Sequence, residues 1–192
     1  MQLEYMILGM LCLRRITGYD LRRWMVEGPG RFLGYGVQLP QIYRTLGKMV
    51  DRGLVAFDVD PREGRPDAKI YRITEQGHEA LLDWARSPYT PSPRPGDLDF
   101  TLRFIFAGQL DREIAIDVVR TELEYRERNV STNGSLDIPD SYEAQVPGLD
   151  PVWAREVQLL AHEQGFAATA SYIAWLKLTL RRLEAGRQPG RG

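Results

Sequence analysis

The spacing of hydrophobic residues along the chain predicts a mainly helical protein that contains one short β-hairpin. In most segments apolar side chains recur every three or four residues, which places them on one face of a helix. Two short segments, 54–59 and 69–73, favour strands, and the charged stretch 60–68 between them predicts an exposed hairpin tip. The predicted helices cover residues 3–13, 18–26, 40–52, 75–86, 97–107, 111–129 and 151–185.

Residue types at the ends of these helices support their boundaries. Thr17 and Thr74 stand where a hydroxyl can accept a hydrogen bond from the first turn of the next helix. Pro40 and Pro151 suit a first turn, because the missing N–H would have no partner there. Gly53 follows the third helix, as expected of a helix-ending glycine.

A proline-rich segment over 87–96 divides the chain and predicts a stiff linker. Before it, the order of three helices, a hairpin and a helix is that of a winged helix-turn-helix, so we expect this DNA-binding fold over 1–86. After it, we expect a helical domain for dimerisation and effector binding over 97–192. Turn residues over 131–150 predict a mobile loop inside that domain.

The predicted helix over 40–52 carries side chains that can read DNA on its polar face. In a winged helix-turn-helix this helix enters the major groove, and the hairpin, called the wing, reaches the flanking backbone. Gln41 offers a donor and an acceptor to a base edge, and Arg44 and Lys48 can reach guanine or phosphate. Thr45 can contact a thymine methyl group or a phosphate. The wing adds three cations, Arg62, Arg65 and Lys69.

The charge balance limits how this chain could bind DNA. Its 25 Lys and Arg against 26 Asp and Glu give a net charge of −1, which excludes a protein that coats DNA through bulk charge. Residues 31–52, however, hold four basic side chains and one acidic one, so the predicted reading face is locally basic. The same pattern also fits an ordinary solvated helix. A winged-helix and helical adaptor that binds protein therefore remains the alternative to a DNA-binding regulator.

Short motifs occur in order at 18–21 (Gly-Tyr-Asp-Leu), 41–46 (Gln-Ile-Tyr-Arg-Thr-Leu), 52–55, 64–66, 69–77, 102–106 and 110–113. Together they resemble the PadR family, named for the regulator of phenolic acid decarboxylase. The resemblance implies a dimeric bacterial repressor that leaves a palindromic operator on binding a small molecule or another signal. It implies that Tyr43, Thr45, Arg65 and Lys69 lie at the DNA. The sequence departs from the family pattern at 67–68, where a further basic residue is common.

The last predicted helix has two apolar stripes, so it packs on more than one side. One stripe can cover its own domain, and the other needs a partner, most simply the same helix of a second chain. Both stripes packing internally is the alternative. The second stripe contains Trp153, Val157, Leu160 and Ala167. The predicted dimer contacts are Leu159, Phe166, Ile173, Leu176, Leu180 and Leu183.

The four tryptophans of the chain are candidate contacts for a small-molecule effector. Trp24, Trp84, Trp153 and Trp175 could line a pocket for a small flat aromatic molecule, although tryptophans more often serve a core or an interface. Trp153 and Trp175 are the stronger candidates because they lie in the predicted effector domain.

No combination of residues predicts an enzyme, a metal site or a cofactor. His162 has no second histidine four positions on, and a single cysteine, Cys12, lies in an apolar run typical of a core. We expect His78 and His162 to be surface residues. The first residues do not resemble a signal peptide and no stretch is long and apolar enough for a membrane span, so we expect a cytoplasmic protein.

Overall fold

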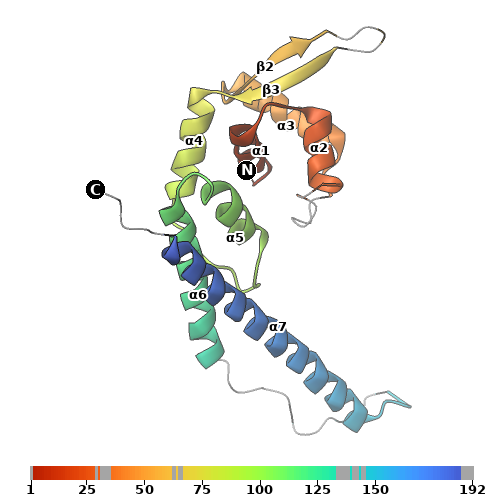
Figure 1. Ribbon diagram of the computed structural model, residues 1–192. Helices are drawn as coiled ribbons and strands as arrows, with labels where there is room; N and C mark the ends of the chain where they lie inside the picture. Colours follow the sequence, from red (N-terminus) through yellow and green to blue (C-terminus); the bar gives the residue numbers. More distant parts are fainter. Residues whose placement is uncertain are drawn as a thin grey trace. The chain divides into compact units, whose positions relative to one another are not determined.

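The computed structural model describes residues 2–28, 30, 36–61, 64, 67–132, 139, 143 and 146–186 (Figure 1). The chain forms two compact units. The first unit is Met1–Tyr89 with Asp97–Val118, and the second is Thr90–Gly96 with Val119–Gly192.

The first unit has the predicted winged helix-turn-helix order. A sharp hairpin follows three helices, and a fourth helix follows the hairpin (Figure 1). The predicted helix over 97–107 consists of a short α-helix that continues into a π-helical turn, here called η2. The elements are α1 (Gln2–Leu13), β1 (Ile16–Thr17), α2 (Gly18–Val26), α3 (Leu39–Asp51), β2 (Val55–Asp60), β3 (Ala68–Ile73), α4 (Glu75–Arg86), α5 (Leu98–Leu102), η2 (Arg103–Ala107) and the start of α6 (Arg112–Thr132).

The helix ends form as their sequences predict. Thr17 Oγ1 accepts a hydrogen bond from the backbone N–H of Asp20 at 3.1 Å. Thr74 Oγ1 accepts one from Gly77 at 3.0 Å and so begins α4. Gly53 follows α3 with φ +70°, a left-handed conformation that favours glycine. These local contacts fix where α2 and α4 begin and where α3 stops.

The small sheet has three antiparallel strands in the order β1-β3-β2. Tyr71 of β3 pairs with Phe57 on one side and with Ile16 of β1 on the other. The hairpin was predicted, but β1 was not, because two residues are too short to show an alternating pattern. Ile16 and Tyr71 are buried on the side that faces the helices.

Residues 97–118 complete the core of the first unit instead of starting a second domain. Leu102 and Phe106 have no exposed surface, and α5 and η2 pack against α1. Gln109 Nε2 donates a hydrogen bond to the carbonyl of Gly9 at 2.9 Å. The apolar surface of α1 and α4 needs this cover, so the compact unit extends beyond the predicted domain boundary, and the division between the units falls within α6.

The second unit pairs the rest of α6 with α7 (Pro151–Ala185), the long final helix that the sequence predicts. Leu176 of α7 is fully buried. Two ion pairs join the helices, Lys177 with Glu127 at 2.7 Å and Arg120 with Glu184 at 3.1 Å. The helix α6 continues to Thr132, beyond its predicted end, and much of the predicted loop lies outside the described residues. Among the described helices, none has the length and apolar character that crossing a membrane requires.

Candidate nucleic-acid interface

The helix α3 has one buried face and one polar face. Ile42, Leu46 and Met49 have no exposed surface and anchor the helix in the core of the first unit. The opposite face exposes Gln41, Arg44 and Lys48, which confirms the predicted amphipathic pattern. Within the described part of the chain, these three side chains make no hydrogen bond or ion pair. They extend from a rigidly packed helix with their polar groups available to a ligand.

Thr45 lies beside this row but uses part of its hydrogen-bonding capacity internally. Its hydroxyl donates to the carbonyl of Gln41 at 2.9 Å, and the side chain is half-buried. The methyl group and the remaining oxygen lone pairs are the parts that could meet a base or a phosphate. The structure therefore narrows the predicted role of Thr45 to an acceptor or an apolar contact.

Tyr43 is held against the start of α2. A Cβ atom on Gly18 would lie 2.6 Å from Cε1 of Tyr43, so the ring packs where only glycine leaves room. The side chain of Tyr43 is nevertheless 44% exposed. Burial, and then the neighbouring Tyr43, raise the pKa of Tyr71, so its phenol stays neutral to a higher pH than an ordinary tyrosine does.

The described part of the wing presents one cation toward α3. The ammonium of Lys69 lies 4.1 Å from the centre of the Phe57 ring, which fixes the direction of a side chain that is otherwise flexible. Arg72 lies on the other face of β3, 3.8 Å from the carboxylate of Asp58. Arg62 and Arg65, the other predicted wing contacts, lie outside the described residues.

A cleft of about 1050 Å³ opens between α3 and the hairpin. Aromatic side chains line it, among them Tyr19 of α2, which is 58% exposed and was not among the predicted site residues. Its position in the motif 18–21 was the only signal that could have identified it. Three carboxylates, those of Asp20, Asp51 and Asp67, also line the cleft, against the single ammonium of Lys69. The lining of the cleft is therefore acidic on balance.

Residues 7–83 match the family model described as "Transcriptional regulator PadR-like family". Over this segment the chain is similar to the PadR-like regulators that the model describes. The PadR-like match begins within α1, ends within α4, and includes α3 and the hairpin. It therefore covers every residue that was predicted to contact DNA.

Similarity to known proteins extends beyond residues 7–83. The "Negative transcriptional regulator PadR" of Bacillus subtilis (strain 168) is 26% identical over 185 residues, which are 95% of this chain and 97% of that protein. A protein of Mycobacterium tuberculosis named a "Probable transcriptional regulator" is 36% identical over 96 residues, about half of each chain. The crystal structure of B. subtilis PadR in complex with operator DNA is 25% identical, covers 94% of this chain and 98% of that one, and aligns with a TM-score of 0.44.

The exposure of side chains on α7 corrects part of the predicted dimer surface. Leu176 has no exposed surface in the single chain, so it belongs to a core of its own chain and cannot contact a partner. Phe166 is 43% exposed. The remaining predicted contacts are half-buried, namely Leu159, Ile173, Leu180 and Leu183. More exposed are residues of the second stripe, Trp153, Val157 and Leu160, together with Leu178.

The tryptophans of the chain divide into core and surface residues. Trp84 is buried and stacks on Tyr5 with ring centres 4.5 Å apart. Trp153 and Trp175, the predicted effector contacts, are 61% and 41% exposed. Neither lines the cleft beside α3, and Trp175 stacks on Tyr172 at 5.8 Å.

The two histidines lie on the surface as expected, whereas Cys12 is less buried than its apolar run predicted. His78 and His162 are exposed, and Cys12 is half-buried within α1, where burial raises the pKa of its thiol and so lowers its reactivity at neutral pH. Among the described residues, no group of three or more His, Cys, Asp or Glu is arranged to hold a metal ion.

Proposed function

We propose that this protein is a transcriptional regulator that binds double-stranded DNA in a sequence-specific way and acts as a repressor. The observation that carries the proposal is the row Gln41, Arg44 and Lys48, exposed on the well-packed helix α3 of a PadR-like domain. A helix of this kind fits the major groove, where an amide and two cations can read base edges. The relative named as a negative regulator supports repression.

The proposed DNA contacts have two different roles, base reading and phosphate neutralisation. Arg44 and Gln41 are the residues that read bases, since guanidinium and amide groups can each make two hydrogen bonds to one base. Lys48 and Lys69 neutralise phosphates, which positions the protein without choosing a sequence. Tyr43 and Thr45 pack at the edge of this row, and Arg62 and Arg65 would extend the phosphate contacts along the wing.

The proposed regulator is a cytoplasmic homodimer. The exposed stripe on α7 formed by Trp153, Val157, Leu160 and Leu178 offers a second copy an apolar surface that the single chain leaves uncovered. A twofold axis would present two copies of α3 to successive major grooves, roughly 34 Å apart, and so would select a palindromic operator.

Release from the operator is proposed to follow a signal in the second unit, without catalysis and without a cofactor. A small aromatic effector would find exposed indole surfaces at Trp153 and at Trp175, where Tyr172 provides a second stacked ring. A ligand that bound one dimer arrangement better than another would shift the population between them and so change operator affinity.

Equilibrium binding to the DNA around the protein's own gene tests the function. We expect wild-type protein to bind a site there with an affinity in the nanomolar range, roughly a thousandfold or more above random DNA. Arg44→Ala should cost about 1–3 kcal/mol and relax the preference at one base position. Arg86→Ala, an exposed arginine at the far end of α4 from the hairpin, is the matched control and should change nothing (Figure 1).

The competing interpretation is a winged-helix adaptor that binds protein. It predicts binding to the chosen DNA no tighter than to random DNA, with no effect of Arg44→Ala. That result would remove the proposal of a regulator.

A further inference from the structure

The cleft between α3 and the hairpin lies entirely within the first unit. Four aromatic rings line its volume of about 1050 Å³, those of Tyr19, Tyr43, Phe57 and Tyr71. Gly47 of α3 also lines it, and a Cβ atom there would meet nothing within 4 Å, so the space above this part of α3 is open. A cleft of this size with aromatic walls suits a flat organic molecule.

The charged groups of the cleft favour a positively charged ligand. The carboxylates of Asp20, Asp51 and Asp67 line it, against the single ammonium of Lys69. Asp51 is exposed and makes no hydrogen bond or ion pair with the described residues. In the part of the chain that the structure describes, no three carboxylates are grouped closely enough to hold a metal ion. The negative charge therefore suits an organic cation.

The chain's own ammonium group shows how a cation fits against these walls. Nζ of Lys69 lies 4.1 Å from the centre of the Phe57 ring, because the face of an aromatic ring attracts a cation. The rings of Tyr19 and Tyr43 are 58% and 44% exposed. Among the described residues, no cation lies over either of these two rings. They leave aromatic surface available to a second cation.

The Tyr71 hydroxyl adds a polar group that the fold does not satisfy. Tyr71 is 5% exposed, and its hydroxyl makes no hydrogen bond to any described residue. No fully enclosed polar side-chain atom of the described residues lacks a partner, so this oxygen reaches the open space of the cleft. A nearly buried phenol oxygen in this position can accept a hydrogen bond from an ammonium group.

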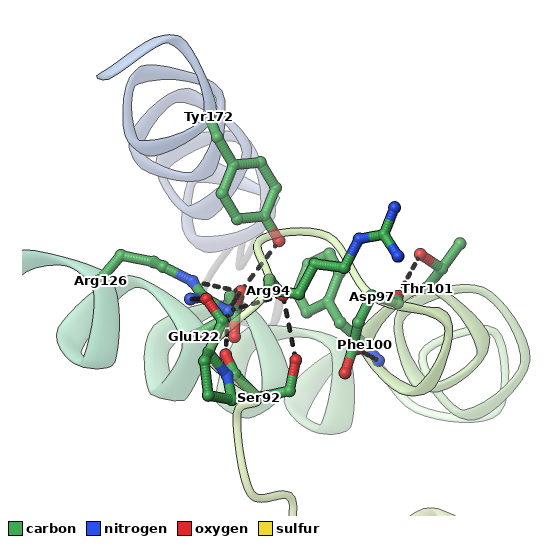
Figure 2. A network of polar contacts seen from close by, with 9 residues as sticks. Ser92, Arg94, Asp97, Phe100, Thr101, Glu122, Arg126 and Tyr172 are labelled. Atoms are coloured by element: carbon green, nitrogen blue, oxygen red, sulfur yellow. Dashed lines mark hydrogen bonds and ion pairs between the residues drawn. The ribbon is translucent and has the colours of Figure 1, made fainter. Parts of the chain in front are cut away.

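Polar side chains in the second unit have partners within the chain. The guanidinium of Arg126 donates hydrogen bonds to Oε1 of Glu122 at 2.8 Å and to the carbonyl of Pro93 in the proline-rich linker at 2.9 Å (Figure 2). The Tyr172 hydroxyl donates to the same glutamate oxygen at 3.1 Å. The phenol of Tyr71 differs from that of Tyr172, because a ligand in the cleft would have to supply its partner.

We propose that this cleft binds a flat aromatic molecule that carries an ammonium group, and that this ligand competes with DNA. Its ring lies against Tyr19 and Tyr43, and its ammonium donates a hydrogen bond to the Tyr71 oxygen within the field of the carboxylates. The competition rests on the proposed function, since Tyr43 and Lys69 line the cleft and are also proposed DNA contacts. It takes place within the first unit alone and needs no signal from the second.

Tryptamine is the probe, because its indole ring is flat and its amine is protonated at neutral pH, as that of lysine is. N-acetyltryptamine keeps the ring without the charge, and indole-3-propionate reverses the charge. Calorimetric titration of the full-length protein measures the three affinities. We expect tryptamine to bind about tenfold or more tightly than N-acetyltryptamine, and indole-3-propionate to bind most weakly.

Two substitutions test whether the cleft is the binding site. Tyr71→Phe should weaken tryptamine binding about fivefold or more. It should leave the free energy of unfolding unchanged, since the hydroxyl has no partner in the fold. Asp51→Asn should weaken tryptamine binding about two- to fivefold. Asp83→Asn, which removes the same charge from an exposed position of α4 outside the cleft, is the matched control and should leave the affinity unchanged.

The competition is measured by DNA binding in the presence of each probe. Tryptamine at about ten times its dissociation constant should lower the affinity for DNA about tenfold, as expected of two ligands that exclude each other. Indole-3-propionate at the same concentration should have no effect.

An absence of tryptamine binding, or equal affinities for tryptamine and N-acetyltryptamine, would overturn the proposed site. Unchanged tryptamine affinity in either cleft variant would place the cation elsewhere on the protein and would also overturn it. Tryptamine binding in the cleft that leaves DNA affinity unchanged would overturn the competition. If wild-type protein binds no DNA, the proposed function fails, whereas the calorimetric comparison still tests the cleft.

Discussion

The Phe106 ring of η2 lies directly on Gly9 of α1. A Cβ atom on Gly9 would be 2.3 Å from Cδ1 of this ring and 2.7 Å from its Cβ atom. Phe106 has no exposed surface, so it cannot swing aside into solvent. This contact joins two segments that are nearly a hundred residues apart and explains why 97–118 belongs to the same compact unit as Met1–Tyr89.

Gly9→Ala should therefore destabilise the protein although alanine favours helices. The added methyl group overlaps with a ring that has nowhere to move, and overpacking of this kind costs about 1–3 kcal/mol. The free energy of unfolding in urea measures the effect. The control is Gly47→Ala on α3, where a Cβ atom would meet nothing within 4 Å and should stabilise the helix by up to about 1 kcal/mol. Equal effects of the two substitutions would contradict the packing described for Gly9.

Lys69→Ala should weaken binding to all DNA sequences alike. The ammonium held over Phe57 is expected to neutralise one phosphate, so its loss should reduce the slope of log affinity against log salt by about 0.9. Fluorescence anisotropy at several salt concentrations gives this slope. Arg72→Ala, on the other face of the same strand, is the control and should leave the slope unchanged. A change in sequence preference with Lys69→Ala would instead indicate a base contact.

Leu160→Asp should separate the proposed dimer without unfolding the chain. The side chain is 49% exposed in the single chain, so the fold does not depend on burying it. In a dimer interface a carboxylate without a partner costs at least about 3 kcal/mol, which raises the dissociation constant roughly a hundredfold. Sedimentation velocity measures this change. His162→Asp adds the same charge to an exposed position of α7 off the stripe and should leave the dimer intact. Two variants with the same dissociation constant would place the interface elsewhere.

The Tyr172 hydroxyl should make stability fall in alkaline solution. Burial above all, and then the Glu122 carboxylate, raise the pKa of Tyr172 above its ordinary value near 10. Above about pH 10 the unfolded chain loses this proton while the folded chain keeps it, so the free energy of unfolding decreases with a slope of up to about 1.4 kcal/mol per pH unit. Below pH 10 the contribution of Tyr172 is constant.

The control is Tyr172→Phe, which has no proton to lose at this position. Its stability should decline less steeply between pH 10 and 11 in urea titrations, because Tyr71, whose pKa is also raised, is present in both proteins. Parallel curves for the two proteins over this range would show that Tyr172 titrates normally.

Some features of this protein could be predicted because their causes are local in the chain. Thr17 and Thr74 cap helices through residues three positions away, and the spacing of Ile42, Leu46 and Met49 shows which face of α3 is buried. The same spacing places Gln41, Arg44 and Lys48 on the opposite face. The candidate reading face was therefore accessible from sequence.

Other features could not be predicted because they depend on partners far away in the chain. The strand β1 exists only because Ile16 pairs with Tyr71. The six predicted dimer contacts on α7 included Leu176, which the fold of its own chain buries completely. The spacing of apolar residues shows that a helix has two apolar sides, but it does not show which side faces its own chain.

The sequence by itself determined the helices, the wing and the polar row on α3, since capping, periodicity and turn residues act within a few positions. Only the tertiary structure decided that η2 packs on Gly9, that Leu176 serves a core, and that Arg126 holds the linker. Such contacts arise when apolar surfaces must be covered and buried polar groups must find partners. Those demands are met by whatever residues the fold brings near, and no local pattern records them.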